Sequence, residues 1–405
     1  MTKIFQIGIA ALTAGTIWCG ASAMAQQAPA SVRIGWAISK TGPYAPGASI
    51  TTLPAYQTWV KDVNAAGGIM LKSAGKKVPV EVVEYDDRSN SDEMIKAVER
   101  LATQDKVDFI LPPWGTAFNL AVAPVLNRAG YPHLAVTATT DRAAEFVKRW
   151  PNIFFLLGTS SEGAHALVDV LTKLREEKKI GNNIAVASVA DQFGIELVTA
   201  ARAAFKKANF NLVYDKSYPL GTQDMQPILS EAMRSNADAF IAFSYPPDTI
   251  AITEQARILN YNPKVFYTAV GTAFPLFRNK FGPNAEGVMG IGGINPQSQA
   301  FKDYLKRHIE TTKSEPDRWA NPVTYASLQM LQQAMERVGM DRAAVIKELQ
   351  TGSFDTILGK VKLKDNLRVD SWQVGQWKGG EYYGVAPANL DGAQQVAFPK
   401  PAWKQ

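Results

Sequence analysis

Short apolar runs alternate with amphipathic stretches along the chain from Val32 onward. The runs VRIGWAI, VPVEVVEY and VDFILP are rich in the β-branched and aromatic residues that strands favour. Between the last two lies DEMIKAVERLATQD, which places Ile95, Val98 and Leu101 on one helical face. This alternation predicts parallel sheets with helices packed on both faces.

The pattern recurs further along, where IAVASVA precedes GIELVTAARAAFKKAN and AFIAFS precedes TEQARILN. These units are too many for one sheet of ordinary width. A chain of 405 residues also exceeds one ordinary hydrophobic core. We therefore expect an α/β fold of two doubly wound parallel-sheet lobes.

The first 25 residues follow a different pattern. Lys3 is their only charge, the segment from Ile4 to Trp18 is largely apolar, and Ala23-Met24-Ala25 resembles a cleavage site. These features predict a secretory signal peptide over residues 1–25, cleaved near Ala25. An uncleaved N-terminal anchor is one alternative. A lipoprotein modified at Cys19 is another, although Trp18 stands where its processing site needs a small residue.

Composition and charge exclude several classes of function. Cys19 is the only cysteine, so the mature chain would have no disulfide, thiol nucleophile or thiolate metal site. The formal charge is +6, or +5 without Lys3, but the basic residues are scattered, and we expect no nucleic-acid partner. No later segment reaches the roughly 20 apolar residues that span a bilayer.

No catalytic set emerges from the motifs. The three histidines lack the spacing of a metal-binding pair, and GTSSEG at 158–163 has the wrong spacing for a nucleophile elbow, so Ser160 is expected at a helix start. In YDDRSNSDE at 85–93, Arg88 stands where an EF-hand needs an oxygen ligand, and Asn90 suits a helix cap instead. We therefore predict no catalytic residues, no metal and no cofactor.

Loops at the carboxyl ends of the strands are where an open parallel sheet binds ligands. The tetrapeptide GTAF occurs in two such loops, at 115–118 and 271–274, and each copy is expected to begin a helix facing the cleft. Hydroxyl and aromatic residues gather in these loops: Tyr44, Trp114, Thr116, Phe118, Thr139, Thr140, Phe193, Tyr245, Thr272 and Phe274. Each threonine alone could be a simple helix cap, and each aromatic could belong to the core. Together they predict a site for a small ligand with an anionic head and an apolar body.

Several segments resemble the periplasmic solute-binding proteins of ABC transporters, specifically the branched-chain amino-acid (Leu/Ile/Val) type. The resemblance rests on IGWAISKTGPYAPGASITTLPAYQTWVKDVNAAGGI, VEVVEYDDRSN, AGYPHLAVTATTDR and QARILNYNPKVFYT, and it extends over most of the mature chain. It implies two lobes joined by three crossings, with the ligand trapped in the cleft by lobe closure. Lobe one would comprise 31–157 plus 288–360, and lobe two 158–287 plus 361–395. A periplasmic, monomeric protein that delivers its ligand to an ABC permease in the inner membrane is expected.

The resemblance also implies roles for individual residues. The ligand carboxylate would be held by Gly115, Thr116, Ala138, Thr139 and Thr140, and the second lobe would contribute Phe193 and Tyr245. Amino-acid binders of this family place a Glu against the ligand's α-ammonium, but here that position is Val270, and no Asp or Glu occurs from Val265 to Phe281.

A buried ammonium without a partner costs several kcal/mol. We therefore expect a carboxylate that lacks the amine: an aromatic acid, a 2-keto acid or a short aliphatic acid, in that order. Asp191 or Asp248 could replace the missing Glu, which keeps branched-chain amino-acid or amide binding as an alternative. An exported α/β enzyme and a receptor ectodomain are further alternatives.

Overall fold

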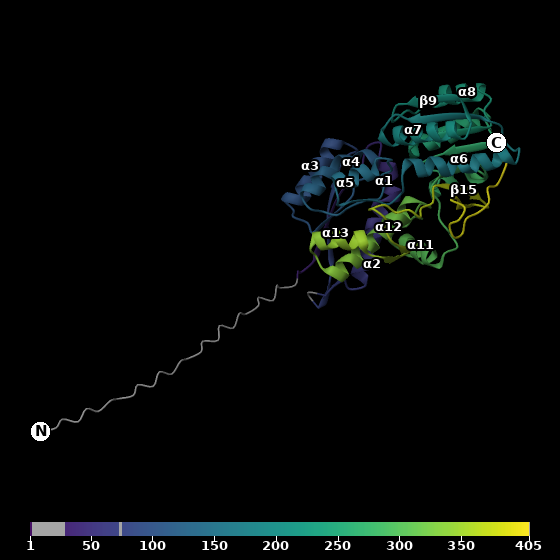
Figure 1. Ribbon diagram of the computed structural model, residues 1–405. Coiled ribbons are helices and arrows are strands. Elements are labelled where there is room, and N and C mark those ends of the chain that lie inside the picture. Colours follow the sequence, from purple (N-terminus) through teal and green to yellow (C-terminus); the bar gives the residue numbers. More distant parts are fainter. Residues whose placement is uncertain (2–28, 73–74, 405) are drawn as a thin grey trace.

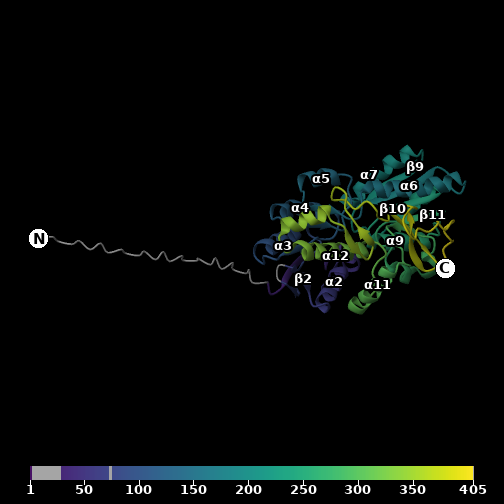
Figure 2. The same ribbon diagram turned by 60° about the horizontal axis from the view of Figure 1, so that its bottom comes forward.

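The computed structural model describes residue 1, residues 29–72 and residues 75–404. The predicted signal peptide and Cys19 therefore lie outside the described residues, apart from Met1. The described chain forms two lobes, with α2, α3, α4 and α13 in one and α6, α7 and α8 in the other (Figure 1). Turning the molecule by 60° keeps the same two groups apart (Figure 2).

The first lobe is built from two separate parts of the chain. Its elements are β1 (Val32–Ile38), α1 (Ala45–Thr51), α2 (Leu53–Ala65), β2 (Ile69–Leu71), β3 (Lys76–Val78), β4 (Val80–Asp86), α3 (Ser91–Thr103), β5 (Phe109–Leu111), α4 (Thr116–Arg128), β6 (His133–Ala135), α5 (Ala143–Arg149) and β7 (Ile153–Phe155), followed later by α11 (Gln299–Thr312), α12 (Ala320–Val338), α13 (Arg342–Thr351), β13 (Phe354–Thr356) and β14 (Gly359–Val361). Its central sheet has the order β4-β1-β5 with parallel pairing, and β6 pairs with β7 in parallel.

The second lobe holds the larger sheet. Its elements are α6 (Ser160–Glu176), β8 (Asn183–Val189), α7 (Gln192–Lys207), β9 (Asn211–Tyr218), α8 (Gln226–Arg234), β10 (Ala239–Phe243), α9 (Pro246–Ile258), β11 (Val265–Thr268), α10 (Pro275–Phe281), the 3₁₀ turn η2 (Gly282–Ala285), β12 (Met289–Ile291), β15 (Val374–Lys378) and β16 (Glu381–Ala386). Seven strands pair in the order β16-β15-β12-β11-β10-β8-β9.

Two of these seven strands depart from the expected all-parallel arrangement. β15 runs antiparallel to β12 and forms a hairpin with β16. Gly379 and Gly380 connect the hairpin with φ angles of 61° and 78°, which a two-residue hairpin turn with left-handed residues requires. The sequence WKGGEYY is a hairpin signal that the strand–helix pattern did not reveal.

The chain crosses between the lobes three times, after β7, after β12 and between β14 and β15. Two boundaries differ from the expected division. Residues 289–291 form β12 in the second sheet, although 288–360 were expected in lobe one. Leu367 bridges to Phe155 of β7, so the last crossing follows this residue rather than position 360. Both differences come from backbone pairing that a strand–helix pattern does not show. Residues 289–291 pair within the second sheet, and Leu367 pairs with Phe155 in the first lobe.

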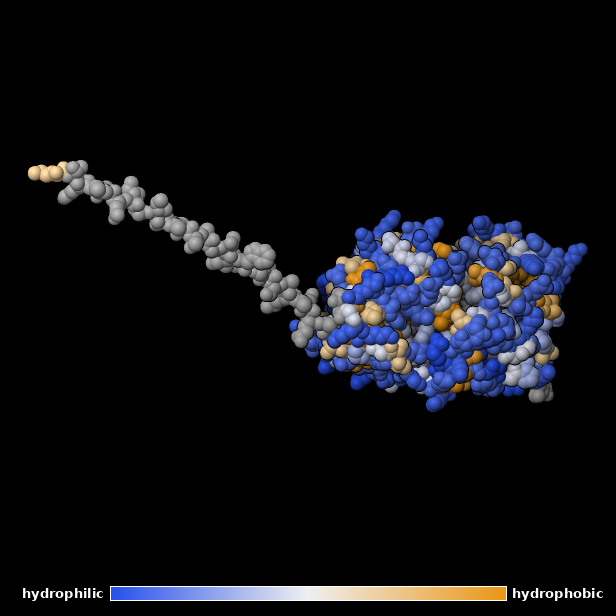
Figure 3. All heavy atoms as spheres, turned by 90° about the horizontal axis from the view of Figure 1, so that it is seen from below, coloured by the Kyte–Doolittle hydropathy of each residue, from blue (hydrophilic) through white to orange (hydrophobic). Residues whose placement is uncertain are grey.

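The two local helix-start predictions are confirmed. Asn90 caps α3 by accepting from the N–H groups of Asp92 and Glu93. Thr159 and Glu162 form a capping box at the start of α6, so Ser160 lies in the first turn of a helix. The face of the molecule seen in Figure 3 is mostly polar, with hydrophobic residues in separate patches.

Candidate functional site

Aromatic side chains from both lobes meet across the cleft. Tyr44 and Trp114 of the first lobe lie with ring centroids 5.7 Å and 5.3 Å from that of Tyr245 in the second lobe. Phe193 stacks on the other side of Tyr245 at 5.0 Å, and Phe118 contacts Tyr44 edge-on at 5.1 Å. All five side chains are buried. The lobes are therefore in contact, and the aromatic residues predicted from the loops converge on one place.

A small cavity with an empty volume of about 340 Å³ lies beside this aromatic cluster. Residues of both lobes line it: Thr51, Trp114, Gly115, Thr137, Thr139, Leu157, Phe193, Tyr245, Val270, Trp319 and Ala320. The lining is apolar with a few hydroxyl groups, as in small-molecule sites. Six of these residues were predicted from the sequence.

One end of the cavity offers unused hydrogen-bond donors. α4 begins at Thr116 with Gly115 as its N-cap and has no side-chain cap, so its first N–H groups lack an intrahelical partner. Gly115 has a φ of 94°, which favours glycine. Thr139 is 4% exposed, and its Oγ1 has no hydrogen-bond partner among the described residues. A positive helix end and a free buried hydroxyl together suit a carboxylate.

Hydrogen bonds among neighbouring residues shape this end of the cavity, which Thr116 itself does not line. The Thr116 Oγ1 accepts from the Thr139 N–H at 3.3 Å and leaves its own proton available to donate. The Gly115 N–H, which was expected to bind ligand, donates instead to Thr137 Oγ1 at 2.9 Å. Thr137 thus fixes the loop conformation, although sequence reasoning did not single it out.

Four further predicted contact residues do not line the cavity. Tyr44 packs its ring against Trp114 and Tyr245 instead. Ala138 packs in a small hydrophobic cluster with Phe146 behind the loop. Thr140 donates its hydroxyl to Glu196 Oε1 at 3.0 Å, a hydrogen bond between the lobes. Phe274 lines a separate groove beside α9 and α10. The lining residues alternate along 137–140, since Thr137 and Thr139 line the cavity while Ala138 and Thr140 do not.

The two GTAF copies are not equivalent. The first begins α4 as predicted, but residues 271–274 form a turn and α10 begins only at Pro275. Thr272 donates to the Thr268 carbonyl oxygen at 2.6 Å and is fully buried. The second copy leads into a helix, with Phe274 as the N-cap of α10, but Thr272 is held against its own strand instead of lying at the helix start.

The part of the cavity nearest the second lobe is neutral. Val270 lines it and is 4% exposed, and none of the lining residues is acidic or basic. One acid behind the lining is Asp191, whose Oδ2 accepts from the Tyr245 hydroxyl at 2.7 Å. Burial raises the pKa of Asp191, against the lowering effect of its hydrogen bonds to Gly194 and Tyr245. Asp248 accepts from the Tyr245 N–H and the Tyr218 hydroxyl, so it serves as a buried helix cap.

The sequence analysis missed the wall of the cavity formed near the hinge. Leu157 lies in the first crossing, and Trp319 and Ala320 lie at the start of α12. Their local sequence carries no signal of a site, since they reach the cavity only when the crossings bring distant segments together. Asp317, which is buried, accepts from the N–H groups of Trp319, Ala320 and Asn321. The start of α12 is thus already capped, whereas that of α4 is not.

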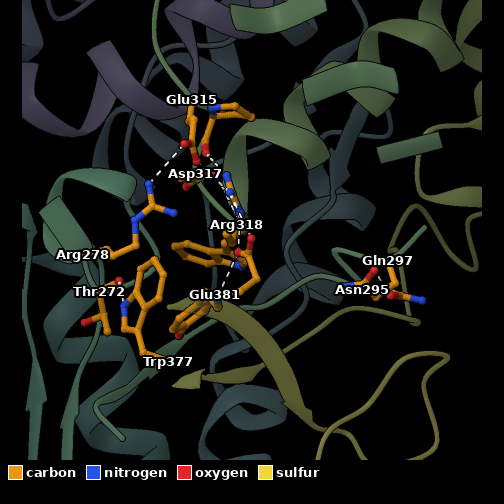
Figure 4. A network of polar contacts seen from close by, with 12 residues as sticks. Thr272, Arg278, Asn295, Gln297, Glu315, Asp317, Arg318, Trp377 and Glu381 are labelled. Carbon is orange, nitrogen blue, oxygen red and sulfur yellow. Dashed lines mark hydrogen bonds and ion pairs between the residues drawn. The ribbon is translucent and has the colours of Figure 1, made fainter. Parts of the chain in front are cut away.

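A polar network joins the lobes beside this wall (Figure 4). Arg318 is buried and pairs with Glu315 at 2.8 Å and with Glu381 of β16 at 2.9 Å. Its N–H donates to the Ala273 carbonyl oxygen at 3.0 Å. Trp377 donates its Nε1–H to the Thr272 carbonyl oxygen at 2.7 Å. These contacts fix the position of Trp319 relative to the loop that contains Val270.

Metal and membrane features were also sought in the part of the chain that the structure describes. Within residues 29–72 and 75–404, no group of three or more His, Cys, Asp and Glu side chains is placed to hold a metal ion. Among the same described residues, no helix has both the length and the apolar content to cross a bilayer.

The sequence matches a family model described as periplasmic binding protein over residues 31–381. The Leu/Ile/Val-binding protein of Escherichia coli (strain K12) is 26% identical over 304 residues, covering 74% of this chain and 78% of that protein. A solute-binding protein of an ABC transporter from R. palustris, solved with benzoate, has a TM-score of 0.76 at 18% identity and covers 90% of this chain and 98% of its own. A branched-chain amino-acid transporter substrate-binding protein from Streptococcus pneumoniae, solved with isoleucine, has a TM-score of 0.73 at 20% identity and covers 91% of this chain and 100% of its own. These likenesses show the fold.

Proposed function

Because the chain belongs to the periplasmic binding protein family, we propose that it is the exported solute-binding component of an ABC importer and captures a small organic carboxylate without an α-ammonium group. An aromatic acid fits best, followed by a 2-keto acid and a short aliphatic acid. The ligand would lie in the cavity between the lobes, with its carboxylate at the start of α4.

The observation that best supports this proposal is that the two ends of the cavity differ in chemistry. The α4 end has an uncapped helix start and the unpartnered Thr139 hydroxyl, which favour a negative charge. The Val270 end has no charged lining residue, so it favours an uncharged, apolar group. The surrounding Trp114, Phe193 and Tyr245 supply flat apolar surface for a ring.

The alternative is an amino-acid ligand in the same fold. The named relatives include Leu/Ile/Val-binding proteins, and Asp191 lies one hydroxyl group behind the cavity wall. Its carboxylate already accepts from the Tyr245 hydroxyl and from the Gly194 N–H. An incoming ammonium would have to displace Tyr245 to reach it, which argues against this alternative.

Ligand capture would proceed by closure of the lobes. Contacts such as Thr140 with Glu196 and Tyr44 with Tyr245 form only when the lobes meet, so a ligand that bridges α4 and the Val270 loop would favour the closed state. We expect a monomer in the periplasm that presents the closed form to an inner-membrane permease.

Matched ligand pairs test the proposal most directly. Calorimetric titration of the mature chain with 4-methylpentanoate and leucine, and with 3-phenylpropionate and phenylalanine, compares molecules that differ only by the amine. We expect the acid of each pair to bind at least tenfold more tightly, which corresponds to about 1.4 kcal/mol. Tighter binding of leucine than of every acid tested would overturn the proposal and favour the amino-acid alternative.

A further inference from the structure

Two buried polar side chains lie behind the loop that leads into α4, and neither lines the cavity. Asn119 of α4 is fully buried, and His133, the first residue of β6, is 1% exposed. The His133 Nε2 lies 3.0 Å from the Asn119 Oδ1. The pair thus connects β6 to the helix at whose start the ligand carboxylate is proposed to bind.

The Asn119 amide engages the carbonyl oxygens of this loop. Its Nδ2 donates to the Gly115 oxygen at 2.8 Å and to the Pro113 oxygen at 2.9 Å, and a third acceptor, Thr137 Oγ1, lies at 3.3 Å. The Asn119 backbone N–H donates to the same Gly115 oxygen at 3.1 Å. One side chain therefore keeps both carbonyl oxygens bonded within the first lobe.

This arrangement decides which backbone groups the loop can offer to a ligand. A carbonyl oxygen beside a carboxylate repels it, whereas the N–H groups of a first helical turn attract it. With the Pro113 and Gly115 oxygens bonded to Asn119, the N–H groups of the first turn of α4 and the Thr139 hydroxyl remain as donors at this end of the cavity. The loop therefore favours an anion because Asn119 keeps its acceptors occupied.

His133 fixes the direction of the amide. Because the Asn119 Nδ2 faces two carbonyl oxygens, Oδ1 is the atom toward His133, so the imidazole donates from Nε2 and its Nδ1 carries no hydrogen. Burial lowers the pKa of His133 to about 3, so the ring is neutral at pH 7 and keeps this single N–H.

Stability alone does not account for a histidine at this position. Its Nδ1 has no hydrogen-bond partner among the residues that the structure describes, and a buried polar atom without a partner costs free energy. An apolar side chain would avoid that cost. The hydrogen bond to Asn119 supplies another reason, because a reversed amide would place Oδ1 against both carbonyl oxygens and leave them without this donor.

We propose that Asn119 and His133 are positioning residues for the ligand carboxylate: Asn119 holds the Pro113 and Gly115 carbonyl oxygens away from it, and His133 holds Asn119 in the required orientation. This inference rests on the proposed function, because it takes the carboxylate to lie at the start of α4. The preference of the site for a negative charge is then set from behind the cavity wall, by residues that do not touch the ligand.

The experiment compares acids with their primary amides, which have nearly the same shape without the charge: benzoate with benzamide, and 4-methylpentanoate with 4-methylpentanamide. Each is titrated calorimetrically into the wild-type mature chain, Asn119→Ala and His133→Leu. The wild type is expected to bind the better acid at least tenfold more tightly than its amide. In Asn119→Ala this preference should fall below about threefold, because acid affinity falls while amide affinity stays within about threefold. In His133→Leu the preference should fall at least about threefold.

Two further variants separate positioning from general damage to the fold. His133→Gln keeps an N–H that can donate to the Asn119 Oδ1, so it should recover most of the preference lost in His133→Leu. Asn366→Gly removes another buried amide, whose Nδ2 donates to the Pro151 and Ile153 carbonyl oxygens at 2.9 Å, and glycine suits its φ of 62°. This control should lower stability and leave the acid preference unchanged.

The outcomes for the two proposals are distinguishable. If the wild type binds an acid and both Asn119→Ala and His133→Leu keep its preference over the amide, the positioning role is refuted and the proposed function stands. An equal loss of acid and amide affinity also refutes the role, since it indicates a loosened fold. If no acid binds the wild type, both proposals are overturned. Thermal unfolding without ligand verifies that each variant is folded, and if Asn119→Ala does not fold, the two His133 variants decide the result.

Discussion

The hydroxyl group of Tyr245 donates to the Asp191 carboxylate at 2.7 Å, directly behind the cavity wall. Asp191 is the N-cap of α7 and also accepts from the Gly194 N–H at 2.9 Å. The Tyr245 ring meanwhile contacts Trp114 of the other lobe. One tyrosine therefore links the contact between the lobes to an acid that lies directly behind the neutral lining.

Replacing Asp191 by Asn tests which charge the site prefers. If the ligand is an anion, removal of this nearby negative charge should tighten acid binding by roughly threefold to tenfold, because Coulomb repulsion is lost. Calorimetry with benzoate or 4-methylpentanoate would measure the change. The exposed Asp303 of α11 offers a control, since Asp303→Asn has the same charge change far from Tyr245. Weaker acid binding in Asp191→Asn would contradict this prediction.

Thr139→Val should weaken ligand binding without a loss of stability. The variant removes a buried hydroxyl that makes no hydrogen bond within the protein, so the free energy of unfolding should not decrease. Acid affinity should fall about tenfold through the lost hydrogen bond to the carboxylate. Calorimetry and urea denaturation report the two quantities separately. Thr253→Val, which removes a hydroxyl bonded to the Thr249 carbonyl oxygen in α9, should lower stability and leave affinity unchanged.

Val270→Glu should convert the neutral end of the cavity into an ammonium site. We expect at least a tenfold loss of acid affinity, from repulsion and desolvation, together with measurable leucine binding. Val270→Gln has nearly the same shape without the charge and separates the two effects. The glutamine variant should lose acid affinity only through crowding and should not bind leucine. Leucine binding by both variants, or by neither, would show that Val270 does not determine the preference.

The buried Asp317 should make stability depend on pH. Burial raises its pKa to about 6, against its backbone hydrogen bonds and Arg318, whereas its usual value is 3.8. The folded state therefore binds a proton more tightly than the unfolded state does. This contribution to stability is fully present below pH 3.8 and is lost as pH rises through about 6.

The size of this effect is on the order of 3 kcal/mol. Asp317→Asn, which keeps an oxygen acceptor for the start of α12, should lack it. Urea denaturation at several pH values from 4 to 7 measures the difference between variant and wild type. An identical pH dependence in both proteins would assign the titration to other groups.

Much of the site could be predicted from the sequence because it depends on local chemistry. The period of apolar residues distinguishes strands from helices, and parallel strands place their carboxyl-end loops at one edge. This was sufficient to find Trp114, Thr139, Phe193 and Tyr245, and the family resemblance added Gly115 and Val270; all six line the cavity. The absence of an acid around Val270 was likewise visible without a structure.

Only the tertiary structure decided which neighbours of these residues face the ligand site. Thr140 and Thr139 are adjacent, yet one hydroxyl bonds to Glu196 across the lobes and the other is free, and this choice depends on how α7 packs against the loop. Trp319 belongs to a segment far along the chain from α4, and it reaches the cavity because the crossings bring the two segments together. The sequence by itself determined the lobes, the loops and the chemistry they carry. The cavity wall near the hinge arises from contacts between distant segments, which no local period encodes.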